Sequence, residues 1–113
     1  MVTYFQDTIF DISPALTAPG TGNLLQVAVN NFFSTKNYTL FAIVENINTN
    51  VVVALNGSID GVNWSKLITN QTITSNGTTH YNIANHPVKY IQPVFVSESG
   101  GTAATVTFQV AAV

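Results

Sequence analysis

Charge is the scarcest property of this sequence. Only eight of its 113 residues carry a charge, three lysines and five acidic residues, and there is no arginine. A typical globular domain is about 25% charged, and such a surface helps to keep monomers apart. Here the polar residues are mainly threonine and asparagine, fifteen and thirteen of them. Because uncharged polar groups cost less to desolvate than charges, the composition predicts a subunit that packs against copies of itself.

Other absences narrow the class of protein further. Without cysteine the chain forms no disulfide. The net charge of −2 provides no basic patch, so nucleic-acid binding is not expected. No run approaches the roughly 18 apolar residues of a membrane span. The first residues lack a basic and then apolar leader, so we expect either a signal peptide already removed or another export route.

What is present follows the periodicity of strands. In Thr105–Val110, apolar and polar residues alternate cleanly, which is typical of a strand with one buried face. Pro93 lies in another such run and, because it cannot donate to a ladder, indicates an edge or a bulge there. Asn-Gly, Asp-Gly and Gly-Gly pairs separate the runs, and no window has helical spacing. The predicted strands are Val2–Ile12, Leu24–Phe33, Tyr38–Glu45, Val51–Ser58, Gln71–Ser75, Thr79–Ile83, Lys89–Ser97 and Thr102–Val110.

About eight short strands at this spacing predict an all-β, single-domain β-sandwich of jelly-roll type. We divide the chain into an N-terminal β extension (residues 1–12), a Pro/Gly/Ala/Thr-rich linker (13–22) and the sandwich (23–113). The extension either joins its own sheet or is donated to a neighbouring subunit. A stretched linker of ten residues reaches roughly 30 Å, which is enough to cross a subunit boundary.

The clearest local motif is the Ser-x-Asp-Gly-x-x-Trp pattern of Ser58, Asp60, Gly61 and Trp64. Gly61 suits the positive φ of a tight turn, Asp60 can accept from nearby backbone N–H groups, and Trp64 can close over the turn. The pattern resembles a turn of many bacterial β-sandwich modules, including discoidin-like domains and phage or surface-fibre subunits. The resemblance implies a structural role for these four residues, with a ligand-binding tip as the alternative.

Sites for chemistry are sparse. His80 and His86, the two histidines, are not spaced as a metal pair, and a zinc site needs three or four ligands. There is no Gly-x-Ser-x-Gly elbow, cysteine nucleophile or phosphate loop. We therefore expect no enzyme, no catalytic residues, no cofactor and no metal. A sugar platform built on Trp64, Tyr81 or Tyr90 is the remaining ligand hypothesis.

The low charge, the apolar strands and the N-terminal β segment together resemble the small jelly-roll subunits of bacterial surface or spore appendage fibres. In those subunits an N-terminal extension reaches between neighbours. The resemblance implies a self-assembling fibre subunit at the cell or spore surface, with copies of itself as its partner. The alternatives are a phage decoration or tail-fibre protein in the virion, and a carbohydrate-binding module. The predicted assembly interface consists of Val2, Tyr4, Phe5, Ile9, Phe10 and Ile12.

Overall fold

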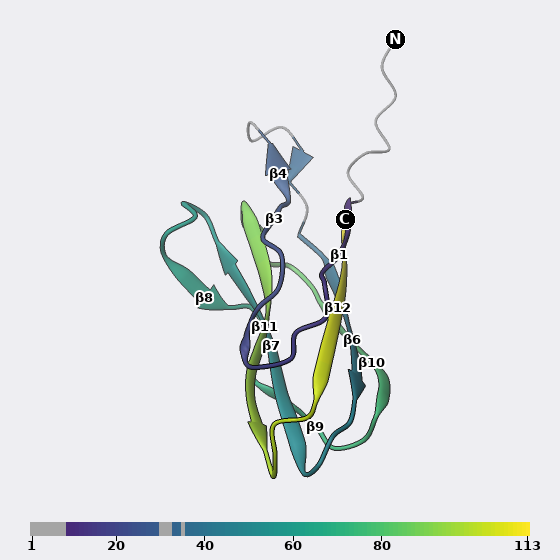
Figure 1. Ribbon diagram of the computed structural model, residues 1–113. Helices are drawn as coiled ribbons and strands as arrows, with labels where there is room; N and C mark the ends of the chain where they lie inside the picture. Colours follow the sequence, from purple (N-terminus) through teal and green to yellow (C-terminus); the bar gives the residue numbers. More distant parts are fainter. Residues whose placement is uncertain (1–8, 30–32, 35) are drawn as a thin grey trace.

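The computed structural model describes residues 9–29, 33–34 and 36–113, and all the regular structure in this part of the chain is β-strand (Figure 1). The described residues contain no helix long and apolar enough to cross a membrane. The prediction of an all-β protein is therefore confirmed.

Two antiparallel sheets face each other. Within the described residues, the β6 sheet has the strand order β1-β12-β6-β10, and the β7 sheet has the order β2-β11-β7-β8, with β3 beside β11 and β9 beside β7. The strands of the β6 sheet are β1 (Ile9–Ile12), β6 (Tyr38–Glu45), β10 (Gly77–Ile83) and β12 (Thr105–Ala112). Those of the β7 sheet are β2 (Gly20–Thr21), β3 (Leu25–Gln26), β7 (Asn50–Ser58), β8 (Trp64–Lys66), β9 (Gln71–Ile73) and β11 (Tyr90–Ser99). A separate pair joins β4 (Ala28–Val29) to β5 (Phe33–Ser34).

The path of the chain between the sheets is that of a jelly roll. It runs from β1 in the β6 sheet to β2 and β3 in the β7 sheet, returns to β6, and crosses again to β7. After β8 and β9, both beside β7, it crosses to β10, then to β11 and finally to β12. If β2 with β3, and β8 with β9, are taken as interrupted strands, the described residues provide eight strand positions in the two sheets, as predicted.

The core lies between the sheets and follows from the alternation of side chains along each strand. In β12, Val106, Phe108 and Val110 are buried, while the residues between them lie on the outer face. Phe95 of β11 and Leu55 of β7 supply large buried side chains from the opposite sheet. Burying one such side chain stabilises the fold by about 1.5–3 kcal/mol. The core therefore holds the two sheets together without a disulfide.

Pro93 does not lie at an edge or at the bulge, contrary to the sequence prediction. It is buried in β11 between β7 and the β2–β3 segment, opposite Leu55, and the bulge of this strand falls further on, between Phe95 and Ser97. The Pro93 carbonyl accepts from the Gly22 N–H at 2.8 Å. In an antiparallel sheet the nitrogen and the carbonyl of one residue point toward the same neighbouring strand. The Pro93 nitrogen, which has no hydrogen to donate, therefore points toward the gap between β2 and β3. No ladder bond to β7 is lost.

The segment predicted as a linker is bound to both sheets. The Ser13 and Leu16 N–H groups donate to the Phe108 and Val106 carbonyls of β12, and Gly22 donates to Pro93 of β11. Ser13 is only 2% exposed, and Leu16 packs against the core. Residues 13–22 therefore carry the chain from the β6 sheet to the β7 sheet and bond to both sheets on the way.

Candidate functional site

The outer face of the β6 sheet combines apolar and aromatic side chains that are exposed or partly exposed. Register pairing places Ile12, Gln109, Phe41 and His80 in one row across the four strands. Phe41 and His80 stack with their ring centroids 5.4 Å apart. Lys, Arg, Asp and Glu are absent from this row, so the row presents contact area without formal charge, and the nearest charge on the outer face of β6 is Glu45 at the end of the strand.

A hollow of about 360 Å³ opens on this face beside β1, and we call it the β1 hollow. Phe10 and Ile12, at 73% and 65% exposed, form its wall on the β1 side. Asp11 also lines it, although alternation directs the Asp11 side chain to the other side of the strand. The remaining lining comes mainly from Thr39, Phe41, Gln109 and Ala111. Large apolar side chains this exposed indicate a contact surface.

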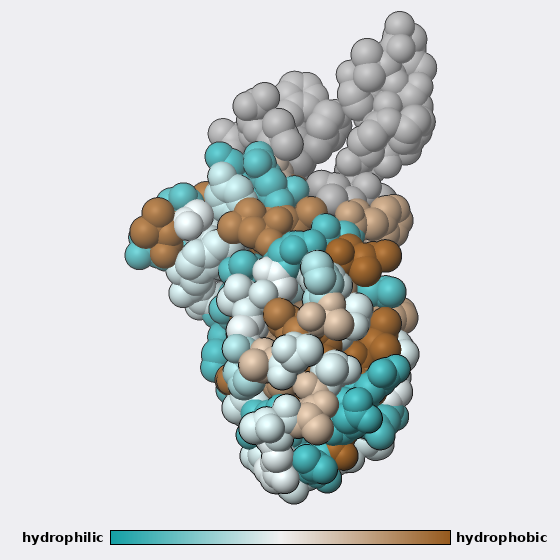
Figure 2. Space-filling model, in the orientation of Figure 1, coloured by the Kyte–Doolittle hydropathy of each residue, from teal (hydrophilic) through white to brown (hydrophobic). Residues whose placement is uncertain are grey.

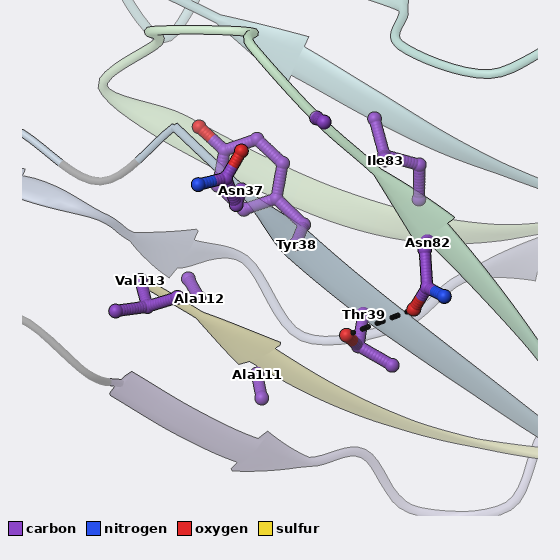
Figure 3. Close-up of a pocket in the computed structure, with 9 residues that line it drawn as sticks. Asn37, Tyr38, Thr39, Asn82, Ile83, Ala111, Ala112 and Val113 are labelled. Atoms are coloured by element: carbon purple, nitrogen blue, oxygen red, sulfur yellow. Dashed lines mark hydrogen bonds between the residues drawn. The ribbon is translucent and has the colours of Figure 1, made fainter.

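A second hollow of about 250 Å³ adjoins the first toward β10 (Figure 3). Both hollows are lined by Thr39 and Ala111. The Thr39 hydroxyl donates to Asn82 Oδ1 at 3.3 Å, which links β6 to β10 across the surface. The Tyr38 hydroxyl donates to the His86 carbonyl at 2.6 Å and fixes the chain after β10. The outer face is thus hollowed from β1 to β10.

β10 is the last strand of the β6 sheet in the described residues. It pairs with β6 in unbroken register from Gly77 to Ile83. Its seven residues include no proline and no charged residue. Proteins usually guard free edges with charges, proline or bulges, because an open ladder is a template for pairing with another chain. Within the part of the chain that the structure describes, β10 carries none of these three guards on its free side.

The turn between β7 and β8 is fixed by Asp60. Its Oδ1 accepts from the Val62 and Asn63 N–H groups at 2.8 and 2.7 Å and from the Ser58 hydroxyl at 3.1 Å. Its Oδ2 accepts from the Asn63 side-chain amide at 2.6 Å. The Gly61 N–H donates to Ser58 Oγ at 2.9 Å, and Gly61 has a φ of +81°, which favours glycine. The backbone N–H groups of Asn63 and Val62, followed by the Asn63 amide, hold the pKa of the Asp60 carboxyl well below its usual range.

Two of the three aromatic residues considered for a sugar platform share a face. Trp64 and Tyr90 are the register partners of Ser58 on either side of β7, so both lie on the outer face of the β7 sheet. Tyr81 packs against the core instead, and burial raises its pKa. The structure therefore brings Trp64 and Tyr90 to one surface but separates Tyr81 from them.

The two histidines have different surroundings. His80 stacks on Phe41, whereas the His86 backbone bonds to Lys36 and Tyr38 in the loop after β10. In the part of the chain that the structure describes, no three His, Cys, Asp or Glu side chains gather as metal ligands would. The structure therefore does not bring the histidines together.

Half of the predicted interface can be located. Val2, Tyr4 and Phe5 lie outside the described residues, and Ile9 pairs with Ala112 at the start of β1. Phe10 and Ile12 form the β1 side of the hollow. Sequence reasoning missed the contribution of β6, β10 and β12 to the same face. Two signals were available in the sequence. The alternation of Thr105–Val110 separates Gln109 from the core, and the run from Tyr38 to Val44 is apolar on both faces, which suits an outer face covered by another subunit.

Comparison with known proteins relates this chain to others through its fold. No protein-family model matches it, and no curated protein matches it in sequence. Among solved structures, it is similar to the crystal structure of the SPBc2 prophage-derived protein YomS, with a TM-score of 0.63 and 11% sequence identity. The match covers 100% of this chain and 99% of YomS. At this identity the likeness concerns the fold, and it extends over the whole sandwich.

Proposed function

We propose that this chain is a structural subunit that assembles with copies of itself by extending the β6 sheet. The observation that carries the proposal is the free, uncharged edge of β10, which lies beside an apolar outer face. An edge of this kind satisfies its backbone groups by pairing with another strand. The low charge of the chain supports the same conclusion, since eight charges create little repulsion between copies.

The direction of the edge strands favours open-ended growth. Each neighbouring pair in the order β1-β12-β6-β10 is antiparallel, so β1 and β10 run in opposite directions. When two copies have the same orientation, β1 of one therefore lies antiparallel to β10 of the next. Such a head-to-tail contact repeats without closing unless the rotation between copies forms a ring.

The N-terminal segment contributes to this contact in our proposal. Ile9–Ile12 pairs with β12 of its own chain. In our proposal, therefore, the residues before Ile9 are the ones that pair with a neighbouring copy. β1 has four residues and β10 has seven. Continuing β1 backwards by three residues would match the length of the β10 edge, and eight residues precede Ile9.

The setting that we favour is a phage particle, because the structurally similar YomS is prophage-derived. Jelly rolls are common in viral capsid proteins, although one fold hosts many functions. An extracellular fibre is the second candidate, supported by the geometry of open-ended growth. In both settings the chain acts by assembly, and we assign it no reaction.

The test introduces lysines as edge guards in the full chain. Thr78→Lys and His80→Lys together place two charges on β10, and we expect long polymers to be lost in negative-stain microscopy and in light scattering after gel filtration. The matched control is Thr69→Lys with Thr102→Lys, two exposed loop positions. Circular dichroism verifies folding. Polymers of wild-type length in the β10 variant would contradict the proposal.

A further inference from the structure

Exposed aliphatic side chains also occur far from the β1 hollow. Ile59 and Val62, in the turn between β7 and β8, are 72% and 78% exposed. We call this pair the turn tip. In Figure 2 hydrophobic surface is visible at the far left, over the turn that leads into β8. Turn positions are usually filled by small polar residues, glycine or proline, so two β-branched aliphatic residues here call for an explanation.

The turn tip is held in one conformation by its neighbours. Asp60, between the two aliphatic residues, is bonded to the turn through both carboxylate oxygens. A Cβ built on Gly61 would lie 3.3 Å from the Tyr90 ring, so the turn is also supported from behind. A contact made by a preorganised turn loses little conformational entropy on binding. This turn therefore suits insertion into a partner.

The β1 hollow has the complementary character. Phe10, Ile12 and Phe41 give it large apolar lining residues, and Ala111 adds a small one. The Asp11 side chain projects from the opposite side of β1, and the Asp60 carboxylate is bonded within its own turn. The two surfaces can therefore meet without burying an unpaired charge.

The positions of the two surfaces decide which copy provides the contact. The β1 hollow is on the outer face of the β6 sheet, whereas the turn tip extends the β7 sheet, and in Figure 1 the β8 turn lies at the left with β1, β12 and β10 at the right. A chain therefore cannot fill its own hollow with its own turn. A hydrophobic patch that fits a pocket elsewhere on an identical molecule makes a head-to-tail contact, which propagates.

We propose that Ile59 and Val62 of one copy insert into the β1 hollow of another copy, which is not the copy paired with it through β10. This inference rests on the proposed self-assembly and adds a second contact to it. The edge contact uses the backbone of β10, whereas this contact uses side chains of the β7–β8 turn and of the outer face. The two contacts can therefore be tested separately.

The absence of cysteine allows a direct test. Val62→Cys and Ala111→Cys are made as separate full-length variants, and both are mild substitutions. They are mixed in equal amounts under a mild oxidant. A disulfide needs the two Cβ atoms within about 4.5 Å. We expect a disulfide-linked heterodimer, identified by mass spectrometry, at a yield at least tenfold above that of the control mixture of Val62→Cys with Thr102→Cys.

The outcomes separate this contact from the proposed function. Equal yields in both mixtures, while the wild-type chain polymerises, would overturn the tip-to-hollow contact and leave edge assembly standing. Equal yields with a wild-type chain that stays monomeric would overturn both. A predominance of disulfide-linked homodimers of the Val62→Cys variant would show that the turn tip contacts the turn tip of another copy. This outcome would also exclude the hollow as its partner.

Discussion

At the scale of single residues, the Ser58–Trp64 turn shows how one side chain can organise a loop. Asp60 replaces the water that would otherwise solvate the Val62 and Asn63 N–H groups. Ser58, only 3% exposed, both accepts from Gly61 and donates to Asp60. A carboxylate with several donors is favoured in its charged form. The low pKa of Asp60 is thus a direct consequence of the shape of the turn.

This charge makes the stability of the turn depend on pH. Because folding lowers the pKa of Asp60, its contribution is complete above the ordinary value of 3.8 and declines as the pH falls toward the lower folded pKa. We expect Asp60→Asn to lower the melting temperature by a constant amount near neutral pH. The difference from wild type should shrink below about pH 4. Thermal melts from pH 7 to pH 2.5 check this, and a difference that does not change with pH would refute it.

Gly22 lies where there is no room for a side chain. A Cβ at this position would lie 2.7 Å from Ser13 Oγ and 2.8 Å from Pro93 Cγ, whereas a Cβ on Gly20 meets its nearest atom at 3.8 Å. We expect Gly22→Ala to destabilise the fold by about 1–3 kcal/mol through overpacking. Gly20→Ala should stay within about 0.5 kcal/mol. Urea unfolding of both variants measures the difference, and equal midpoints would show that the Ser13–Pro93 contact yields easily.

At the scale of elements, long runs rich in apolar and β-branched residues were predictable as strands, and short strands were not. Tyr38–Glu45 was predicted with the bounds that the structure has. Leu24–Phe33 was expected as one strand, but its described part contains the short β3 and β4 and the first residue of β5. Trp64–Lys66 was missed, because three residues show no period. Alternation identifies buried faces, whereas the pairing of short strands depends on neighbours distant in sequence.

The candidate surface was predictable only in part, for a related reason. The exposed Phe10 and Ile12 were recognised from their own segment. These two residues share a face with Phe41 and His80 because the strands of the sheet have the order β1-β12-β6-β10. A local sequence pattern does not specify this order. The Ser-x-Asp-Gly motif predicted a turn, but its exposed aliphatic tip becomes apparent only from the accessibility of Ile59 and Val62.

The N-terminal element allows a prediction that separates stability from assembly. Deleting Met1–Ile12 removes β1 from β12, so we expect loss of polymers together with a lower melting temperature. Deleting only Met1–Thr8 keeps β1, and we expect an unchanged melting temperature but shorter polymers. Scanning calorimetry and electron microscopy measure the two effects. Full-length polymers after the shorter deletion would exclude a contribution from the residues before Ile9.

At the scale of the whole molecule, the scarcity of charge predicts how assembly responds to salt. Raising NaCl from about 0.1 M to about 1 M shortens the Debye length from roughly 10 to 3 Å. With three lysines and five acidic residues in the chain, backbone pairing and apolar contacts dominate in our proposal. We expect the apparent dissociation constant to change less than about threefold, measured by sedimentation. A tenfold weakening would point to ionic contacts instead.

The pairing of β1 with β12 also has a mechanical consequence. Ile9 at the start of β1 is the register partner of Ala112 at the end of β12, so both strands can be pulled from the same end of the sandwich. Tension applied through these two positions would open the β1–β12 ladder one pair after another, as a zipper opens. Four residue pairs would not be loaded together in shear. The first strand would therefore detach at low force, while the eight residue pairs between β12 and β6 continue to hold.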